Sequence, residues 1–259
     1  MPQAQLSRPY DNGARWLARA AFLGISILTL SCGRDSITNP SGTALSGTVS
    51  LQDAWGNDLD DFSGVTVSVG GLSLKAVTDK NGSWHIDDVP AGRYDLILVK
   101  AAFGTMRILD QAVVGSSTTA PKITMASTPT VQALIDSIYV GTLSGMSFYF
   151  VDGHLSAPPP ANSKLAVAVI FLSKNESVSP DPASYDQWSA SLGLDGKSSE
   201  FKMALPVDGT RATFGSGTQL FVTGYSNSAA CSCYDDPATK KRVFTNTGPR
   251  GNVVRFTVQ

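Results

Sequence analysis

Glutamate is almost missing from this 259-residue chain, since only Glu176 and Glu200 among its 21 acidic residues are glutamates. Aspartate, which supplies the others, favours turns and helix caps over helix interiors, so the composition argues against a helical protein. Hydrophobic residues still make up 42% of the chain and charged residues only 16%. The chain therefore has enough apolar material to bury a core and fold.

Histidine is equally scarce, and this limits the chemistry. His85 and His154 are the two histidines of the chain, so a zinc peptidase site lacks the imidazoles to complete its ligand set. Neither the Gly-x-Ser-x-Gly motif of serine hydrolases nor a phosphate-cradling glycine motif occurs. Asp58, Asp60 and Asp61 crowd one segment, but the spacing of an EF-hand is not met. We expect no enzyme activity, no cofactor and no metal. The segment with Asp58, Asp60 and Asp61 is expected to be a solvated turn.

Clusters of positive charge are also lacking. The longest basic run is Lys240-Lys241-Arg242, and the formal net charge is -1. Proteins that bind a phosphate backbone carry a basic patch or stripe. Nucleic acid is therefore not an expected partner.

No hydrophobic run is long enough to span a bilayer. The longest, Ala20 to Leu30, has eleven residues, whereas a spanning helix needs about 20. Three arginines precede this run and a polar segment follows it, as in an export signal. Leu28-Thr29-Leu30-Ser31-Cys32 resembles the lipobox of bacterial lipoproteins, although Thr29 departs from the usual leucine. The alternative is a secretory peptide that is cut nearby and leaves Cys32 an ordinary thiol.

The lipobox resemblance implies acylation of Cys32, a lipid anchor in a membrane, and a place in the bacterial cell envelope. Gly33, rather than aspartate, follows the cysteine, and this favours placement in the outer membrane. Acylation also leaves an even pair, Cys231 and Cys233, in an oxidising compartment. Residues i and i+2 of a strand lie about 6.6 Å apart, near the limit for a disulfide, unless a turn shortens the distance. The two cysteines bond to each other if they bond at all.

The rest of the chain alternates apolar and polar residues as strands do. Val65, Val67 and Val69 alternate with polar residues, and Thr78 to Gly82 is typical of a hairpin turn. The sequence T-D-x-N-G-x-W-x-I-x-x-V-P-x-G-x-Y-x-L, which begins at Thr78, resembles carboxypeptidase regulatory-like domains. That resemblance implies a transthyretin-like seven-stranded sandwich that carries no catalytic group.

A second β-rich region follows a hinge at Ala126 to Thr130. Seven strand-like runs suggest an immunoglobulin-like or fibronectin-III-like sandwich. The runs are Val131–Val140, Met146–Leu155, Leu165–Leu172, Glu200–Val207, Gln219–Ser226, Arg242–Thr245 and Asn252–Val258. Asp181 and Pro182 suit the start of one short helix, Pro182 to Leu192, which we expect to be the only helix of the folded part.

The predicted architecture is all-β, with two consecutive antiparallel β-sandwich domains after a signal helix and a short tether. The segments are a lipoprotein signal peptide (1–31), a tether (32–43), a carboxypeptidase regulatory-like domain (44–126) and an immunoglobulin-like domain (127–259).

Aromatic residues in polar surroundings give the candidate ligand site. Tyr185 and Trp188 would share a face of the predicted helix, and Trp55 lies in a segment rich in Asp and Asn. Such rings suit stacking on sugars, with hydrogen bonds to the hydroxyls; alternatively, the rings cap the ends of their sandwiches. We therefore predict a non-catalytic envelope lipoprotein that serves as a binding, scaffolding or accessory module. The alternatives are a carbohydrate-binding accessory of an outer-membrane uptake system and a regulatory partner of a separate peptidase.

Overall fold

Strands make up most of the chain between Thr43 and Thr257 in this computed structural model, which describes residues 42–191 and 198–259. The all-β prediction is confirmed: the strands form several sheets, in which all pairings are antiparallel except those of the first strand with β7 and β8. Within the described residues, no helix is long and apolar enough to cross a membrane. The predicted signal peptide and nearly all of the tether lie outside the described residues.

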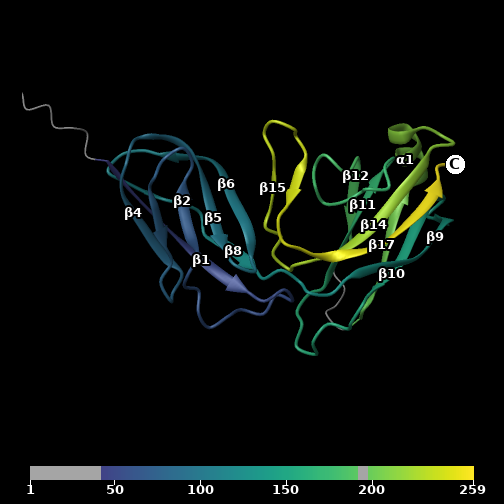
Figure 1. Cartoon of the computed structure of the whole chain (residues 1–259), viewed down its shortest axis with the longest axis horizontal. Helices are drawn as coiled ribbons and strands as arrows, with labels where there is room; N and C mark the ends of the chain where they lie inside the picture. The colour runs from purple at the N-terminus through teal and green to yellow at the C-terminus, as the bar shows by residue number, and fades with distance from the viewer. Residues whose placement is uncertain (1–41, 192–197) are drawn as a thin grey trace, which may run out of the picture. The chain divides into compact units, whose positions relative to one another are not determined.

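The first half of the described chain is a two-sheet sandwich (Figure 1). One sheet joins β1 (Thr43–Gln52), β4 (Ser83–Val89), β7 (Ser117–Thr119) and β8 (Ile123–Ala126). The other has the order β3-β2-β5-β6, from β2 (Thr66–Val69), β3 (Lys75–Val77), β5 (Gly92–Lys100) and β6 (Gly104–Val113). Their inward side chains form one buried cluster that runs from Leu45 to Met125.

The predicted turn is present between β3 and β4, but it connects the two sheets and does not join paired strands of a hairpin, since β3 pairs with β2 and β4 with β1. The Asp79 carboxylate accepts the backbone N–H groups of Asn81 and Ser83. Gly82 has a φ of +79°, and a Cβ at this position would lie 1.8 Å from the Val49 carbonyl oxygen. Only glycine therefore fits this turn.

The second half begins with two facing sheets around another buried cluster. One sheet has the order β13-β10-β9, from β9 (Ala133–Leu143), β10 (Met146–Leu155) and β13 (Glu200–Pro206). The other has the order β12-β11-β14-β17, from β11 (Val167–Ser173), β12 (Gln187–Ala190), β14 (Gln219–Asn227) and β17 (Thr247–Thr257). The cluster between them runs from Ala133 to Val258.

A third layer covers the outer face of the second of these sheets. Strand β11 is buried on both sides: Ile170 and Leu172 point into the cluster between the sheets, whereas Val169 and Phe171 point outwards. The outward side chains join a separate aromatic cluster, which we call the covered face. Its buried members are Val169, Phe171, Val178, Tyr185, Tyr225 and Phe244. They come in part from the chain after β11 and from the hairpin of β15 (Cys233–Asp235) and β16 (Arg242–Phe244).

The predicted helix from Pro182 to Leu192 is wrong over its described part. The Asp181 carboxylate does accept a nearby backbone N–H, from Ala183, but it closes a turn. The chain then forms strand β12, in which Trp188 pairs with Phe171 of β11. Pairing with the edge of an apolar sheet has overridden the local capping preference.

The helix in the described residues is instead α1 (Val207–Phe214), directly after β13. Val207, Thr210 and Phe214 face the core between the sheets, and Asp208 forms an ion pair with Arg211 one turn later. The chain leaves the helix at Gly215, whose φ of +88° favours glycine.

The hinge predicted at Ala126 to Thr130 lies between the end of β8 and the start of β9. Several hydrogen bonds cross from one half to the other. The Trp55 carbonyl accepts the N–H groups of Lys164 and Leu165, and the Asn246 side chain donates to the Ala126 carbonyl. Independent folding of the two halves stays a prediction.

Candidate functional site

The outer face of sheet β13-β10-β9 carries aromatic side chains that no other layer of the described chain buries. Along β10, Tyr149, Val151 and Leu155 point into the core between the sheets. The alternate residues therefore point outwards, because successive side chains of a strand lie on opposite faces. These outward residues include Phe148, Phe150, Asp152 and His154, none of which is fully buried.

The strand register brings residues of β9 and β13 beside each outward residue of β10. The flanking pairs are Gly141 and Pro206 beside Phe148, Tyr139 and Ala204 beside Phe150, and Ser137 and Lys202 beside Asp152. The face thus changes from aromatic to polar along β10. We call Tyr139, Phe148, Phe150, Asp152, His154 and Lys202 the open face.

Three rings form the aromatic part of the open face. The Tyr139 and Phe150 centroids lie 5.6 Å apart with the planes 26° from parallel, and those of Phe148 and Phe150 lie 6.1 Å apart. The Phe150 ring covers Gly141: a Cβ at Gly141 would lie 2.8 Å from Phe150 Cε2. The ring can lie close to the sheet there because glycine has no side chain. Tyr139 is 42% exposed, so ligands can reach this group of rings.

Lys202 links the rings to the polar part. Its Nζ donates a hydrogen bond to Tyr139 Oη at 2.9 Å and lies 3.3 Å from Asp152 Oδ2. The same Nζ lies 5.6 Å from the Tyr139 centroid and 5.8 Å from that of Phe150. The pKa of Lys202 is raised above its usual value, mainly by the hydrogen bond to Tyr139 and next by the hydrogen bond to Asp152. The lysine is therefore a fixed cation between the aromatic and acidic groups.

A hollow of about 720 Å³ forms the polar part of the open face. Its lining includes Asp136, Asp152, His154, Glu200 and Lys202. The His154 ring Nδ1 lies 2.9 Å from Asp136 Oδ2, which fixes the orientation of the imidazole. Within the described residues, no group of three or more His, Cys, Asp or Glu side chains could hold a metal ion. The hollow therefore offers hydrogen-bonding groups beside a set of rings.

The structure places the predicted ligand residues Tyr185 and Trp188 in the covered face. Tyr185 is only 3% exposed, and its hydroxyl donates a hydrogen bond of 2.5 Å to the Arg242 carbonyl. Burial raises the pKa of Tyr185. Trp188 is half-buried and packs edge-on against Phe244, with Arg242 over its ring. The two rings are thus close together, as predicted, but Tyr185 is occupied by contacts within the protein.

Trp55, the third predicted ligand residue, does not join them. It lies in the loop after β1, where its backbone N–H donates to the Asp53 carboxylate. Its ring is half-buried and packs against the cluster between the two sheets of the second half. This contact connects the first half to the core of the second.

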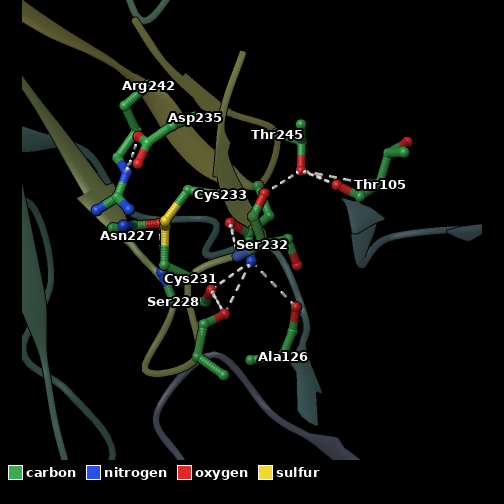
Figure 2. The surroundings of a disulfide bond; sticks show 12 residues. Thr105, Ala126, Asn227, Ser228, Cys231, Ser232, Cys233, Asp235, Arg242 and Thr245 are labelled. Carbon is green, nitrogen blue, oxygen red and sulfur yellow. Dashed lines mark hydrogen bonds and ion pairs between the residues drawn. A yellow bond between two sulfur atoms is a disulfide. The ribbon is translucent and has the colours of Figure 1, made fainter. Parts of the chain in front are cut away.

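The structure joins Cys231 and Cys233 in a disulfide with their Cα atoms 5.2 Å apart (Figure 2). Cys231 precedes β15, so the two cysteines do not lie in one extended strand and the distance is shorter than a strand would give. Ser232, between them, is buried, and its N–H donates to the Asn246 side chain. Close by, the Thr245 hydroxyl accepts the Thr105 N–H (Figure 2). Cys32, the predicted lipidation site, lies outside the described residues.

The open face was missed in the sequence, although one pattern indicated it. From Met146 to Leu155 both alternating sets of residues contain aromatic and apolar side chains, so the inward set is ambiguous. Only the set of Phe148 and Phe150 continues into charged or polar residues, Asp152 and His154. An aromatic set that continues into such residues is typical of a solvent-facing strand face with a binding role.

No protein-family model and no curated protein matches the chain. Among solved structures, a chain of a cohesin–X-dockerin complex of Acetivibrio cellulolyticus is 28% identical to this chain. The match covers 34% of this chain and 59% of that one, with a TM-score of 0.30. A candidate carbohydrate binding protein from Bacteroides uniformis is 12% identical over 84% of this chain and 99% of its own, with a TM-score of 0.28. A DUF3823 family protein from Parabacteroides merdae is 11% identical over 83% of this chain and 98% of its own, with a TM-score of 0.31.

Proposed function

We propose that this protein is a non-catalytic binding module and that its open face binds carbohydrate. One observation carries the proposal: Tyr139, Phe148 and Phe150 form a solvent-facing group of rings directly beside a hollow lined with carboxylates and a lysine. The C–H face of a sugar ring is apolar and packs on aromatic rings, while its hydroxyls exchange hydrogen bonds with charged and polar groups. The open face supplies both kinds of contact, one after the other along β10.

The position of Lys202 supports a small polar ligand group over a purely apolar partner. Its ammonium lies within 6 Å of two ring centroids, and the Lys202 side chain as a whole is 57% exposed. An apolar protein surface that covered these rings would also cover the ammonium, at a desolvation cost. Sugar hydroxyls can instead take the place of water around it.

A lectin-like binding test can separate stacking on sugars from general apolar contact. The purified chain would be run in native gels that contain neutral soluble polysaccharides, with Phe150→Leu, Phe150→Tyr and Trp188→Ala alongside. We expect at least one polymer to retard the wild type and Phe150→Tyr, both of which keep a ring, and to lose most of its effect on Phe150→Leu. Trp188→Ala serves as the comparison for the covered face and should remain retarded.

Equal retardation of Phe150→Leu and wild type would exclude the open face as the site. Retardation that is lost only in Trp188→Ala would move the site to the region around Trp188. No retardation by any polysaccharide would exclude the carbohydrate function.

We also propose that the module is held at a bacterial membrane by acylation of Cys32, on the basis of the lipobox resemblance and the short apolar run before it. A fatty-acid probe should label the wild-type protein in cells and leave Cys32→Ser unlabelled. Equal labelling of the two would contradict the anchor.

A further inference from the structure

The open face is long enough for a chain of sugars. Phe148 and His154 lie at the two ends of its outward row on β10. At about 3.4 Å per residue, this row extends about 20 Å along the strand. A single sugar would fill only part of it, so the geometry favours an extended glycan that lies along β10.

The polar end of this row carries an excess of negative charge. Asp136, Asp152 and Glu200 line the hollow, and among its described lining residues Lys202 is the one lysine or arginine. The Lys202 ammonium is already bound to the Asp152 carboxylate and to the Tyr139 hydroxyl. Among the described residues, Glu200 has no ion-pair partner, and Asp136 is paired only with His154. The lysine charge is therefore already balanced by a carboxylate, although its side chain remains 57% exposed.

Charges at the other end of the open face do not change this balance. A second hollow, next to Phe148, is lined by Asp208 and Arg211, which form an ion pair at 3.0 Å. The Arg211 guanidinium also donates to the Gln259 carbonyl. Within the residues that the structure describes, neither end of the row thus offers an unpaired cation to a carboxylate, sulfate or phosphate on a glycan.

We infer that the open face selects extended neutral glycans and excludes acidic ones, because a ligand with its own carboxylates would meet Asp136 and Glu200 at the polar end. The inference rests on the proposed function. Carboxylates accept hydrogen bonds from sugar hydroxyls, so the groups that repel an acidic glycan would also orient a neutral one.

The test compares one polymer with its own acidic derivative. A neutral polysaccharide that retards the wild type would be oxidised at its primary hydroxyls, which converts them to carboxylates, and the affinity for both forms would be measured at low and high salt. We expect the oxidised form to bind at least tenfold more weakly at low salt, with part of the loss recovered at high salt because ions screen the repulsion. A panel of uronic-acid polysaccharides should not retard the protein.

Two variants test whether the weaker binding of the oxidised polysaccharide comes from charge repulsion or from the loss of its primary hydroxyls. Asp136→Asn with Glu200→Gln keeps hydrogen-bonding groups and removes two charges, so the difference between the neutral and oxidised forms should narrow several-fold. Asp60→Asn, on an exposed loop of the first half, is the matched control and should leave the difference unchanged.

The outcomes distinguish this inference from the function on which it rests. Equal or tighter binding of the oxidised form, or retention by uronic-acid polymers, would overturn the charge selection while leaving carbohydrate binding intact. An unchanged difference in the double variant would also overturn it. Absence of binding to every polymer, neutral or acidic, would overturn both.

Discussion

The two sheets of the second half each carry aromatic side chains on their outer faces, but they differ in what lies over them. On sheet β12-β11-β14-β17, the chain after β11 and the β15-β16 hairpin cover Phe171, and they supply Tyr185 and Phe244, which pack against its ring. On sheet β13-β10-β9, no described layer buries Tyr139, Phe148 and Phe150. The covered rings pack edge-on or tilted against one another, whereas Tyr139 and Phe150 are nearly parallel.

This comparison separates two uses of the same residue types. Rings under a third layer contribute the hydrophobic and aromatic contacts of a core and hold that layer in place. Rings that remain accessible stabilise the fold little and are free for a ligand. Aromatic content alone therefore does not identify a binding site; the covering layer decides.

The largest expected difference between the two faces is in stability. Phe171 is fully buried, and Phe171→Ala should lower the free energy of unfolding by about 3–5 kcal/mol. Phe150 is only half-buried, so Phe150→Ala should cost about 1 kcal/mol. Denaturant unfolding of both variants measures the difference. Similar losses in the two variants would break the distinction between a covered and an open face.

A smaller effect is expected from the disulfide in the covering layer. Replacing Cys231 and Cys233 by Ser opens a loop of only three residues, which restricts the unfolded chain little. The cost should be about 1–2 kcal/mol, measured by denaturant unfolding. Carbohydrate retardation of this variant should equal that of the wild type, because the open face has no contact with the bond. Loss of retardation would show that the two faces are coupled.

The smallest effect concerns a single hydroxyl beneath the covering layer. Tyr185→Phe removes the hydrogen bond to the Arg242 carbonyl and should cost about 1 kcal/mol at neutral pH. Burial raises the pKa of Tyr185, so the wild type should lose stability as the pH rises above about 10, where the unfolded tyrosine ionises first. Tyr185→Phe should show a shallower alkaline loss. An identical alkaline slope in the two proteins would mean that Tyr185 is not buried in solution.

The first half of the fold could be predicted closely because its signals are local. The turn at Asp79 to Gly82 depends on a carboxylate that accepts neighbouring N–H groups and on one glycine that no other residue can replace. The run from Met146 to Leu155 was likewise predicted with the bounds of β10. Such features depend on residues within a few positions of one another.

The third layer and the site could not be predicted, because they depend on contacts between distant segments. Strand β12 exists because the edge of β11 accepts it, which outweighs the capping preference of Asp181. Burial of Tyr185 requires Arg242, 57 positions away. Accessibility of the half-buried Phe150 likewise depends on the fact that no described segment covers it, which the sequence of β10 alone does not indicate.

The rings themselves give the most direct test of the central claim that the open face is the carbohydrate site. NMR spectra of protein with labelled Phe and Tyr rings would be recorded during titration with a neutral polysaccharide fragment that binds. The account predicts shifts at Tyr139, Phe148 and Phe150, with Phe171, Tyr185 and Phe244 unchanged. Gly141→Ala should weaken these shifts, since its Cβ would displace the Phe150 ring. Shifts confined to the covered face, with Tyr139, Phe148 and Phe150 unmoved, would contradict it.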